Sequence, residues 1–310
     1  MKKKNNPVIF VVGATASGKS EWALKLAQEF NGVVINCDSV QLYKKLDIGS
    51  AKPSAAERAL VPHHLFDYVS FPEEMTAGNY ARDFFSCMDS LPDGVPAFVV
   101  GGTGFYFMAI EKGMYPVTSV PEEIKEQIAK ELTEEGGPER LREELKKIDP
   151  EYAAKIHEPD HYRLGRAVEL IRSQNKSVTQ IQKEFAEKQT PFPYPLLKMG
   201  PTWDREILRE RIQQRTTKML TQGLITEVQN LLDEGLASWA PMSSVGYKEC
   251  LQFLRGEFDE IKLQEEIAKN TAQLAKRQRT WFQRDKEIHW LEGSSGYPEA
   301  RTLVENFLKT

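Results

Sequence analysis

Eight residues near the N-terminus, GATASGKS from Gly13 to Ser20, constrain the fold of this chain more than any other segment. They match the phosphate-loop pattern G-x-x-x-x-G-K-[ST]. The apolar run 7–12 before them is typical of a buried strand, and residues 21–30 after them are typical of a helix. This arrangement points backbone N–H groups and the Lys19 ammonium at an anion. It predicts a phosphate or pyrophosphate site, with a plain glycine-rich turn as the alternative.

The predicted site includes every residue of the loop. The Ser20 hydroxyl is the candidate ligand for a magnesium ion beside the phosphates. The candidate phosphate-binding residues are Gly13, Ala14, Thr15, Ala16, Ser17, Gly18, Lys19 and Ser20.

Composition indicates an ordinary globular chain. Its 310 residues can form one large domain or two, and no stretch has the apolar length that a membrane span needs. Three scattered cysteines give neither a disulfide framework nor a metal-ligand spacing, so we expect a cytoplasmic protein. A net charge of -4 argues against indiscriminate coating of nucleic acid but allows a local basic surface.

Short apolar runs at 32–37 and 95–100, separated by a helical pattern at 75–88, predict a parallel sheet. Ligands of such sheets lie beyond the carboxyl ends of the strands, so the phosphate loop, Asp38 and residues 101–104 should share one rim. Residues 196–200 are a candidate further strand. Long helices are expected at about 204–234, ended by Gly235, and at about 259–286.

Between these parts, residues 121–188 are charged and rich in helix formers, and strand-like runs disappear. We therefore expect an α/β fold with a phosphate-loop-type parallel sheet flanked by helices, interrupted by an all-helical insertion domain. The expected catalytic core comprises residues 1–117 and 191–310, and the insertion comprises residues 118–190.

Asp38 follows a predicted strand and is a candidate general base or metal ligand, whereas capping of the following segment is the alternative. A nucleotide-hydrolysing phosphate-loop protein also needs a strand ending in a magnesium-binding Asp. Here the run 95–100 is followed by Gly-Gly-Thr instead, and we find no other strand-end carboxylate. This incomplete set favours group transfer from a bound diphosphate over nucleotide hydrolysis.

Residues 101–106, GGTGFY, place glycines, a hydroxyl and two aromatic rings on the same rim. Glycines allow close approach of a ring or backbone, and aromatic side chains can stack on a base. A tight turn into a helix explains the segment equally well.

Arginines are frequent in the predicted helix after residue 204. Arg211 and Arg215 are four residues apart and share a face, so they could fork a diphosphate. Solvated arginines paired with neighbouring glutamates are the alternative, and we expect one or two of the four to reach the site. The four are Arg205, Arg209, Arg211 and Arg215.

Residues 269–286 contain six basic residues against Asp285 alone, with Trp281 and Phe282 among them. This stretch is a candidate nucleic-acid surface, and a solvated helix face is the alternative. Residues 162–166 form a second basic cluster. The adjacent His63 and His64 point to opposite faces and are not expected to bind metal.

Taken together, seven segments in chain order resemble the bacterial tRNA dimethylallyltransferases, also called tRNA isopentenyltransferases. The segments are GATASGKS (13–20), INCDSVQLYKKLDIGSAKP (35–53), VPHHLFD (61–67), FVVGGTGFY (98–106), HYRLGRAVE (161–169), SVGYKE (244–249) and LAKRQRTWF (274–282). The resemblance implies magnesium and transfer of a dimethylallyl group from its diphosphate to N6 of adenosine 37 in the anticodon loop of tRNAs that read codons beginning with U. It implies no membrane association, and we expect a monomer.

The resemblance also implies residue roles. Asp38 would be the base for the adenine amine, and Thr15, Lys19, Ser20 and Arg215 would surround the diphosphate. The residues that would touch tRNA are Asp38, Ser39, Val40, Gln41, Thr103, Tyr162, Arg163, Arg166, Ser243, Gly246, Tyr247, Lys248, Lys276, Arg277, Arg279 and Trp281. Ala14 stands where a proline is frequent, and Lys248 where some relatives carry arginine; we expect the first change to be silent.

Two alternatives share parts of this pattern. An adenylate dimethylallyltransferase would use the same loop and aspartate on a free nucleotide, but it would not require the insertion and the basic helix. A phosphate-loop kinase or nucleotide-hydrolysing RNA-binding module would require the acidic strand end that is missing here.

Overall fold

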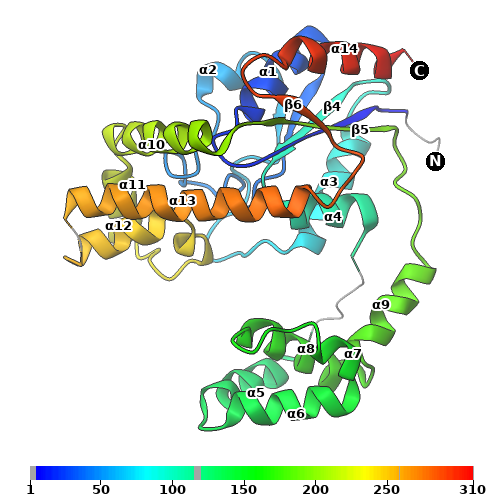
Figure 1. Cartoon of the computed structure of the whole chain (residues 1–310), viewed down its shortest axis with the longest axis vertical. Helices are drawn as coiled ribbons and strands as arrows, with labels where there is room; N and C mark the ends of the chain where they lie inside the picture. The colour runs from blue at the N-terminus through cyan, green and yellow to red at the C-terminus, as the bar shows by residue number, and fades with distance from the viewer. Residues whose placement is uncertain (1–4, 115–119, 258, 310) are drawn as a thin grey trace. The chain divides into compact units, whose positions relative to one another are not determined.

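The computed structural model describes residues 5–114, 120–257 and 259–309, and the chain divides into two compact units (Figure 1). The first unit comprises Met1–Glu111 and Phe192–Thr310, and the second comprises Lys112–Pro191. The predicted boundary at residues 117–118 lies outside the described residues.

A six-stranded parallel sheet forms the centre of the first unit, with the order β3-β2-β4-β1-β5-β6. Of the four inner strands, β1, β2 and β4 are buried at every position, as expected where helices cover both faces. The strands are β1 (Val8–Val12), β2 (Val33–Asn36), β3 (His63–His64), β4 (Ala97–Gly101), β5 (Leu196–Thr202) and β6 (His289–Glu292). The four predicted strands are confirmed. The edge strands β3 and β6 were not predicted, because they are short and lack a buried apolar run.

Helices cover the two faces of this sheet. Alternate residues of β1 point to opposite faces: Ile9 packs with α1 and α14, whereas the Phe10 ring contacts that of Phe107 on α4. The helices of the first unit are α1 (Lys19–Glu29), α2 (Ala55–Arg58), α3 (Ala77–Ser90), α4 (Gly104–Lys112), α10 (Arg205–Thr221), α11 (Leu224–Asp233), the 3-10 helix η1 (Ala240–Ser243), α12 (Tyr247–Leu254), α13 (Glu260–Phe282) and α14 (Tyr297–Leu308).

The two long helices end earlier than predicted. The single helix expected at 204–234 is interrupted at Gly223, whose φ of 98° separates α10 from α11. Such a left-handed backbone favours glycine and breaks the helical hydrogen-bond pattern. The helix expected to reach Lys286 stops at Phe282, because the chain turns and Asp285 binds the buried ammonium of Lys198 on β5.

Within its described residues the second unit is helical, with a core that includes Ile128, Leu145 and Leu164. The helices of this unit are α5 (Glu122–Thr133), α6 (Gly137–Ile148), α7 (Pro150–Ala153), α8 (His161–Gln174) and α9 (Val178–Glu187). Arg172 of α8 forms forked hydrogen bonds to Glu131 of α5 and Glu144 of α6, and so joins the three helices.

Candidate active site

The phosphate loop connects the carboxyl end of β1 to the start of α1, in the middle of the sheet. Gly18 immediately precedes α1 with a φ of 89°, which favours glycine; because glycine has no side chain, the helix has no side-chain cap at this end. The first N–H groups of an α-helix have no partner within the helix. The loop therefore presents backbone donors and the positive end of the α1 dipole to a bound anion.

Two side chains from a distant part of the chain hold carbonyl groups of this loop. Arg211 Nε donates to Ala16 O at 2.8 Å, and Trp203 Nε1 donates to Ser17 O at 2.8 Å. The Arg211 guanidinium also lies 4.4 Å from the centre of the Trp203 ring, in cation–π contact. These bonds fix the loop from outside the strand–loop–helix unit.

Two loop side chains turn inward. Ala14 is buried in a small apolar cluster with Ile212 of α10 and Ala275 of α13. The buried Ser17 Oγ has no hydrogen-bond partner within the described part of the chain. Ala14 can therefore serve an anion only through its backbone groups. The side chain of Ser20, by contrast, is exposed at the start of α1.

The two cations Lys19 and Arg215 lie beside the loop, together with the carboxylate of Asp38. Burial lowers the pKa of Lys19 to about 8; the negative charge of Asp38 counteracts this effect, and the positive charge of Arg215 adds to it. Burial also lowers the pKa of Arg215, again opposed by Asp38. Lys19 Nζ donates to Ala14 O at 3.2 Å, and Arg215 Nη1 donates to Thr15 Oγ1 at 2.7 Å. An incoming diphosphate would stabilise the charged form of both cations.

Of the four candidate arginines, Arg211 and Arg215 reach the loop, while Arg205 and Arg209 are exposed. The structure thus brings two of the four arginines to the phosphate loop. Only Arg215 contacts a loop side chain, whereas Arg211 supports the backbone. The two guanidinium groups therefore have different partners.

Asp38 lies two residues beyond β2 and is held by local hydrogen bonds. Its backbone N donates to Asn36 Oδ1 at 3.0 Å, and Val40 N donates to its Oδ1 at 3.0 Å. The side chain thus forms the capping interaction that the sequence left open. This interaction uses Oδ1 of Asp38 and fixes the orientation of its carboxylate. The negative charge of the same carboxylate raises the pKa of Lys19 and of Arg215, against the effect of burial.

The glycine-rich turn after β4 packs against the chain's own side chains. A Cβ on Gly101 would lie 1.9 Å from Cys37 O, and one on Gly104 would lie 2.1 Å from Trp281 Cδ1. An aromatic ring does approach this turn, but it is Trp281 of α13. Thr103 Oγ1 accepts a hydrogen bond from Ser39 N at 2.9 Å, which joins the turn to the segment after Asp38. Tyr106 is buried and stacks on Tyr80, so it is not available to a base.

The remaining residues implied to touch tRNA differ in exposure. Tyr247 is fully buried and donates its hydroxyl to Glu227 at 2.7 Å, so it supports the neighbouring loops rather than facing a partner. Gly246 is buried too, and Gln41 Nε2 donates to Ser50 O and Ala51 O. The exposed members in the first unit are Ser243, Lys248, Lys276, Arg277, Arg279 and Trp281, while Ser39 and Val40 are half-buried. In the second unit, Tyr162 and Arg163 are exposed, and Arg166 pairs with Glu169.

Sequence reasoning missed three residues that bind the loop or the strand end: Trp203, Gln278 and Asn36. Gln278 Oε1 accepts a hydrogen bond from Thr15 N at 2.8 Å. Asn36 Nδ2 donates to Asp38 O and Leu65 O. The one available signal was the spacing of Gln278 and Trp281, which share a face of the predicted helix.

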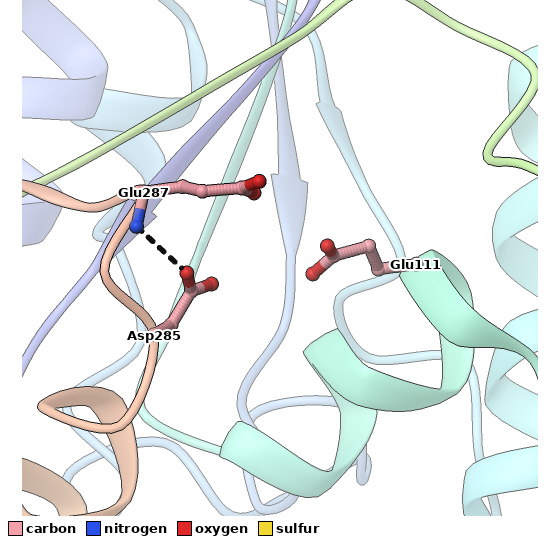
Figure 2. A group of neighbouring side chains, drawn as sticks. All are labelled: Glu111, Asp285 and Glu287. Carbon is pink, nitrogen blue, oxygen red and sulfur yellow. Dashed lines mark hydrogen bonds between the residues drawn. The ribbon is translucent and has the colours of Figure 1, made fainter.

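Figure 2 shows one group of three carboxylates close enough together to bind a metal, Glu111, Asp285 and Glu287. Lys198 Nζ donates to all three, at 2.6, 2.9 and 2.7 Å respectively. Although burial lowers the pKa of Lys198, these bonds raise it well above its ordinary value. The ammonium group compensates the charge of this cluster, so we do not assign a metal to it.

In the described residues, no helix is long and apolar enough to cross a membrane. The strand–loop–helix unit with its phosphate-loop motif, the two cations Lys19 and Arg215 and the adjoining carboxylate of Asp38 define an α/β protein of the phosphate-loop type.

Comparisons with known proteins identify the family. The chain matches the family model described as IPP transferase over residues 41–285 and the one described as isopentenyl transferase over residues 6–64. The tRNA dimethylallyltransferase of Bdellovibrio bacteriovorus is 72% identical over 302 residues, which cover 97% of this chain and 98% of that protein. The tRNA dimethylallyltransferase of Koribacter versatilis is 38% identical over 291 residues, covering 93% and 94%.

Solved structures agree. The full-length tRNA isopentenylpyrophosphate transferase of Bacillus halodurans matches with a TM-score of 0.71 at 30% identity, covering 99% of this chain and 97% of that one. A eukaryotic dimethylallyltransferase acting on tRNA matches with a TM-score of 0.84 at 25% identity, covering 98% and 80%. This chain belongs to the tRNA dimethylallyltransferase family. The predicted family and the predicted α/β fold class are both confirmed.

Proposed function

We propose that this enzyme transfers a dimethylallyl group from dimethylallyl diphosphate to N6 of adenosine 37 in the anticodon loop of tRNAs that read codons beginning with U. The observation that carries the proposal is the convergence of Lys19, Arg215 and Asp38 at the phosphate loop. Two cations suit a leaving diphosphate, and the carboxylate suits an amine that must lose a proton.

In this reaction the bond between C1 of the dimethylallyl group and the diphosphate oxygen breaks as a bond from C1 to N6 forms. Negative charge develops on the leaving oxygen, where the loop N–H groups, Lys19 and Arg215 stabilise it. Asp38 orients the amine and accepts its proton. Its bond from Val40 N holds the carboxylate in place, so little reorganisation is needed when the proton moves.

Magnesium is the proposed cofactor. A magnesium ion at a phosphate site usually keeps several waters and takes few protein ligands besides the phosphates. The exposed hydroxyl of Ser20 at the start of α1 fits such a site, since it lies where the loop presents its donors. When bound, magnesium would neutralise charge on the diphosphate oxygens. Lys19 and Arg215 remain the protein's own positive groups at this position.

We assign tRNA binding to two separate sets of surface residues. On α13, Lys276, Arg277 and Arg279 offer cations to phosphates, and Trp281, 37% exposed, offers a ring to a base. In the second unit we propose that residues 118–190 contact tRNA through Tyr162, Arg163 and Arg166. Tyr162 is 82% exposed, so its ring is accessible to a base of the tRNA.

The target base must leave its stack before it can reach Asp38, at a cost of a few kcal/mol. The basic surfaces would supply binding energy to offset this cost. We propose that the protein acts as a monomer in the cytoplasm, where tRNA and a reducing environment coincide. Its three cysteines are free thiols.

The test is mass spectrometry of nucleosides from unmodified tRNA incubated with the protein, magnesium and dimethylallyl diphosphate. The expected product is N6-dimethylallyladenosine, formed with release of one diphosphate for each group transferred. Prenylation of AMP, ADP or ATP without prenylation of tRNA would indicate the adenylate transferase instead. Steady turnover of a nucleoside triphosphate without any transfer would indicate a kinase or nucleotide hydrolase.

A further inference from the structure

One helix, α13, touches both proposed substrate sites through opposite faces. Its outward residues Lys276, Arg277 and Arg279 are exposed. Its inward residue Ala275 is buried against Ala14 of the phosphate loop, in the cluster that also contains Ile212. Because a helix moves largely as a rigid element, a force applied to its outer face reaches the loop behind it.

Gln278 provides the polar part of this connection. Its Oε1 accepts a hydrogen bond from Thr15 N at 2.8 Å, across 263 positions of sequence. The hydroxyl of the same threonine accepts a bond from Arg215 at 2.7 Å. Gln278 of α13 therefore holds the backbone N of Thr15, and Arg215 of α10 holds its hydroxyl. Arg215 is also a proposed ligand of the diphosphate.

The other end of the Gln278 amide lies against the glycine-rich turn. A Cβ on Gly102 would come within 2.2 Å of Gln278 Nε2. Gly102 is followed by Thr103, which binds Ser39 next to Asp38. Gln278 thus lies between the phosphate loop and the turn that supports the segment carrying the proposed base.

We propose that Gln278 is a positioning residue that couples the two substrates: docking of tRNA on the outer face of α13 tightens the phosphate loop around the diphosphate. The proposal rests on the proposed function and extends it. Gln278 acts through Thr15 and Arg215, and it needs no contact with either substrate. By linkage, pyrophosphate bound in the loop must strengthen tRNA binding by the same factor.

The experiment measures binding of magnesium pyrophosphate by calorimetry, with and without saturating tRNA; this probe binds in the loop but transfers no group. In the parent protein, tRNA should tighten pyrophosphate binding by roughly fivefold or more. Gln278→Met keeps the length of the side chain but removes the acceptor for Thr15 N. It should bring this factor to about one and weaken tRNA-free pyrophosphate binding roughly tenfold. The affinity for tRNA alone should not change.

Three further variants test the geometry. Gly102→Ala should reproduce the Gln278→Met result, because the new methyl group displaces the flexible end of Gln278, and the two changes together should not add. Gln278→Glu keeps an acceptor and should keep the coupling factor. Gln273→Met, at an exposed position of the same helix, should behave as the parent.

The outcomes distinguish a failure of the proposed function from a failure of the proposed coupling. A parent that binds neither pyrophosphate nor tRNA overturns the proposed function and this inference with it. A parent that binds both but without coupling overturns the inference alone. Coupling that survives in Gln278→Met also overturns the inference. An equal loss of tRNA and pyrophosphate affinity in this variant, together with a lower melting temperature, would indicate a purely structural role for Gln278 and would overturn the inference too.

Discussion

The cations of the phosphate loop and those on the outer face of α13 are chemically alike but physically different. Lys19 is buried and Arg215 is half-buried, and desolvation lowers the pKa of both. Lys276, Arg277 and Arg279 remain in water. A desolvated cation interacts strongly with one charge in one place, whereas a hydrated cation is screened by salt and tolerates many positions of its partner. Burial therefore separates cations suited to chemistry from cations suited to docking.

The largest expected effect is at the carboxylate of Asp38, which acts on Lys19 and Arg215. Asp38→Ala should lower the rate of transfer on the order of 10²–10⁴-fold while tRNA still binds, because a general base is lost but the docking surface is intact. The rate is measured by single-turnover transfer to tRNA, and tRNA affinity by filter binding. Asp83→Ala, at a carboxylate on α3, is the control. Transfer within threefold of the parent would remove Asp38 from the chemistry.

The next effect concerns the buried cations. Arg215→Ala and Lys19→Ala should each weaken dimethylallyl diphosphate binding roughly 10- to 100-fold, since each removes a charge-assisted bond in a partly desolvated site. Affinity for tRNA should change little. Arg209→Ala, an exposed arginine on the same helix, should leave both affinities unchanged. An unchanged Michaelis constant and turnover in Arg215→Ala would place this residue outside the site.

A third expectation follows from the pKa of Lys19. Because burial lowers this pKa to about 8, Lys19 is protonated below that pH and loses its charge as the pH rises through it. Only the charged form attracts diphosphate, so affinity should fall between about pH 7 and about pH 9, by at most about tenfold per unit. Calorimetry in buffers of different ionisation enthalpy should also detect proton uptake on binding near pH 8.

Lys19→Arg supplies the control for this pH dependence. Arginine stays charged throughout the range, so the variant should show a flat profile even if its affinity is lower. A flat profile in the parent protein would mean that Lys19 keeps its proton, and would weaken the contrast between buried and exposed cations.

The smallest effect is expected at the exposed cations and should depend on salt. Arg277→Ala combined with Arg279→Ala should reduce tRNA affinity more at low salt than at high salt. Each lost phosphate contact lowers the magnitude of the salt slope by roughly 0.7–0.9. Pyrophosphate affinity without tRNA should be unchanged. Lys262→Ala, at the other end of α13, is the matched control. Equal slopes in parent and variant would show that these arginines do not meet the tRNA backbone.

Local sequence determined much of this molecule. The loop from Gly13 to Ser20, the four inner strands and the candidate base Asp38 follow from patterns within a few residues, because strand and loop preferences depend on neighbouring side chains. Seven motifs in order then identified the family. The break at Gly223 was also a local signal, but the helical pattern on both sides concealed it.

The tertiary structure decided which groups meet and which are buried. Trp203, Arg211 and Gln278 hold the phosphate loop from 186 to 263 positions away, and no local pattern predicts such contacts. Folding likewise buried Tyr247 and brought three carboxylates from distant segments around the buried Lys198. Hydrogen bonds and charge pairs between distant segments exist only after the apolar core has brought the segments together, and their strength depends on how much water the packing excludes.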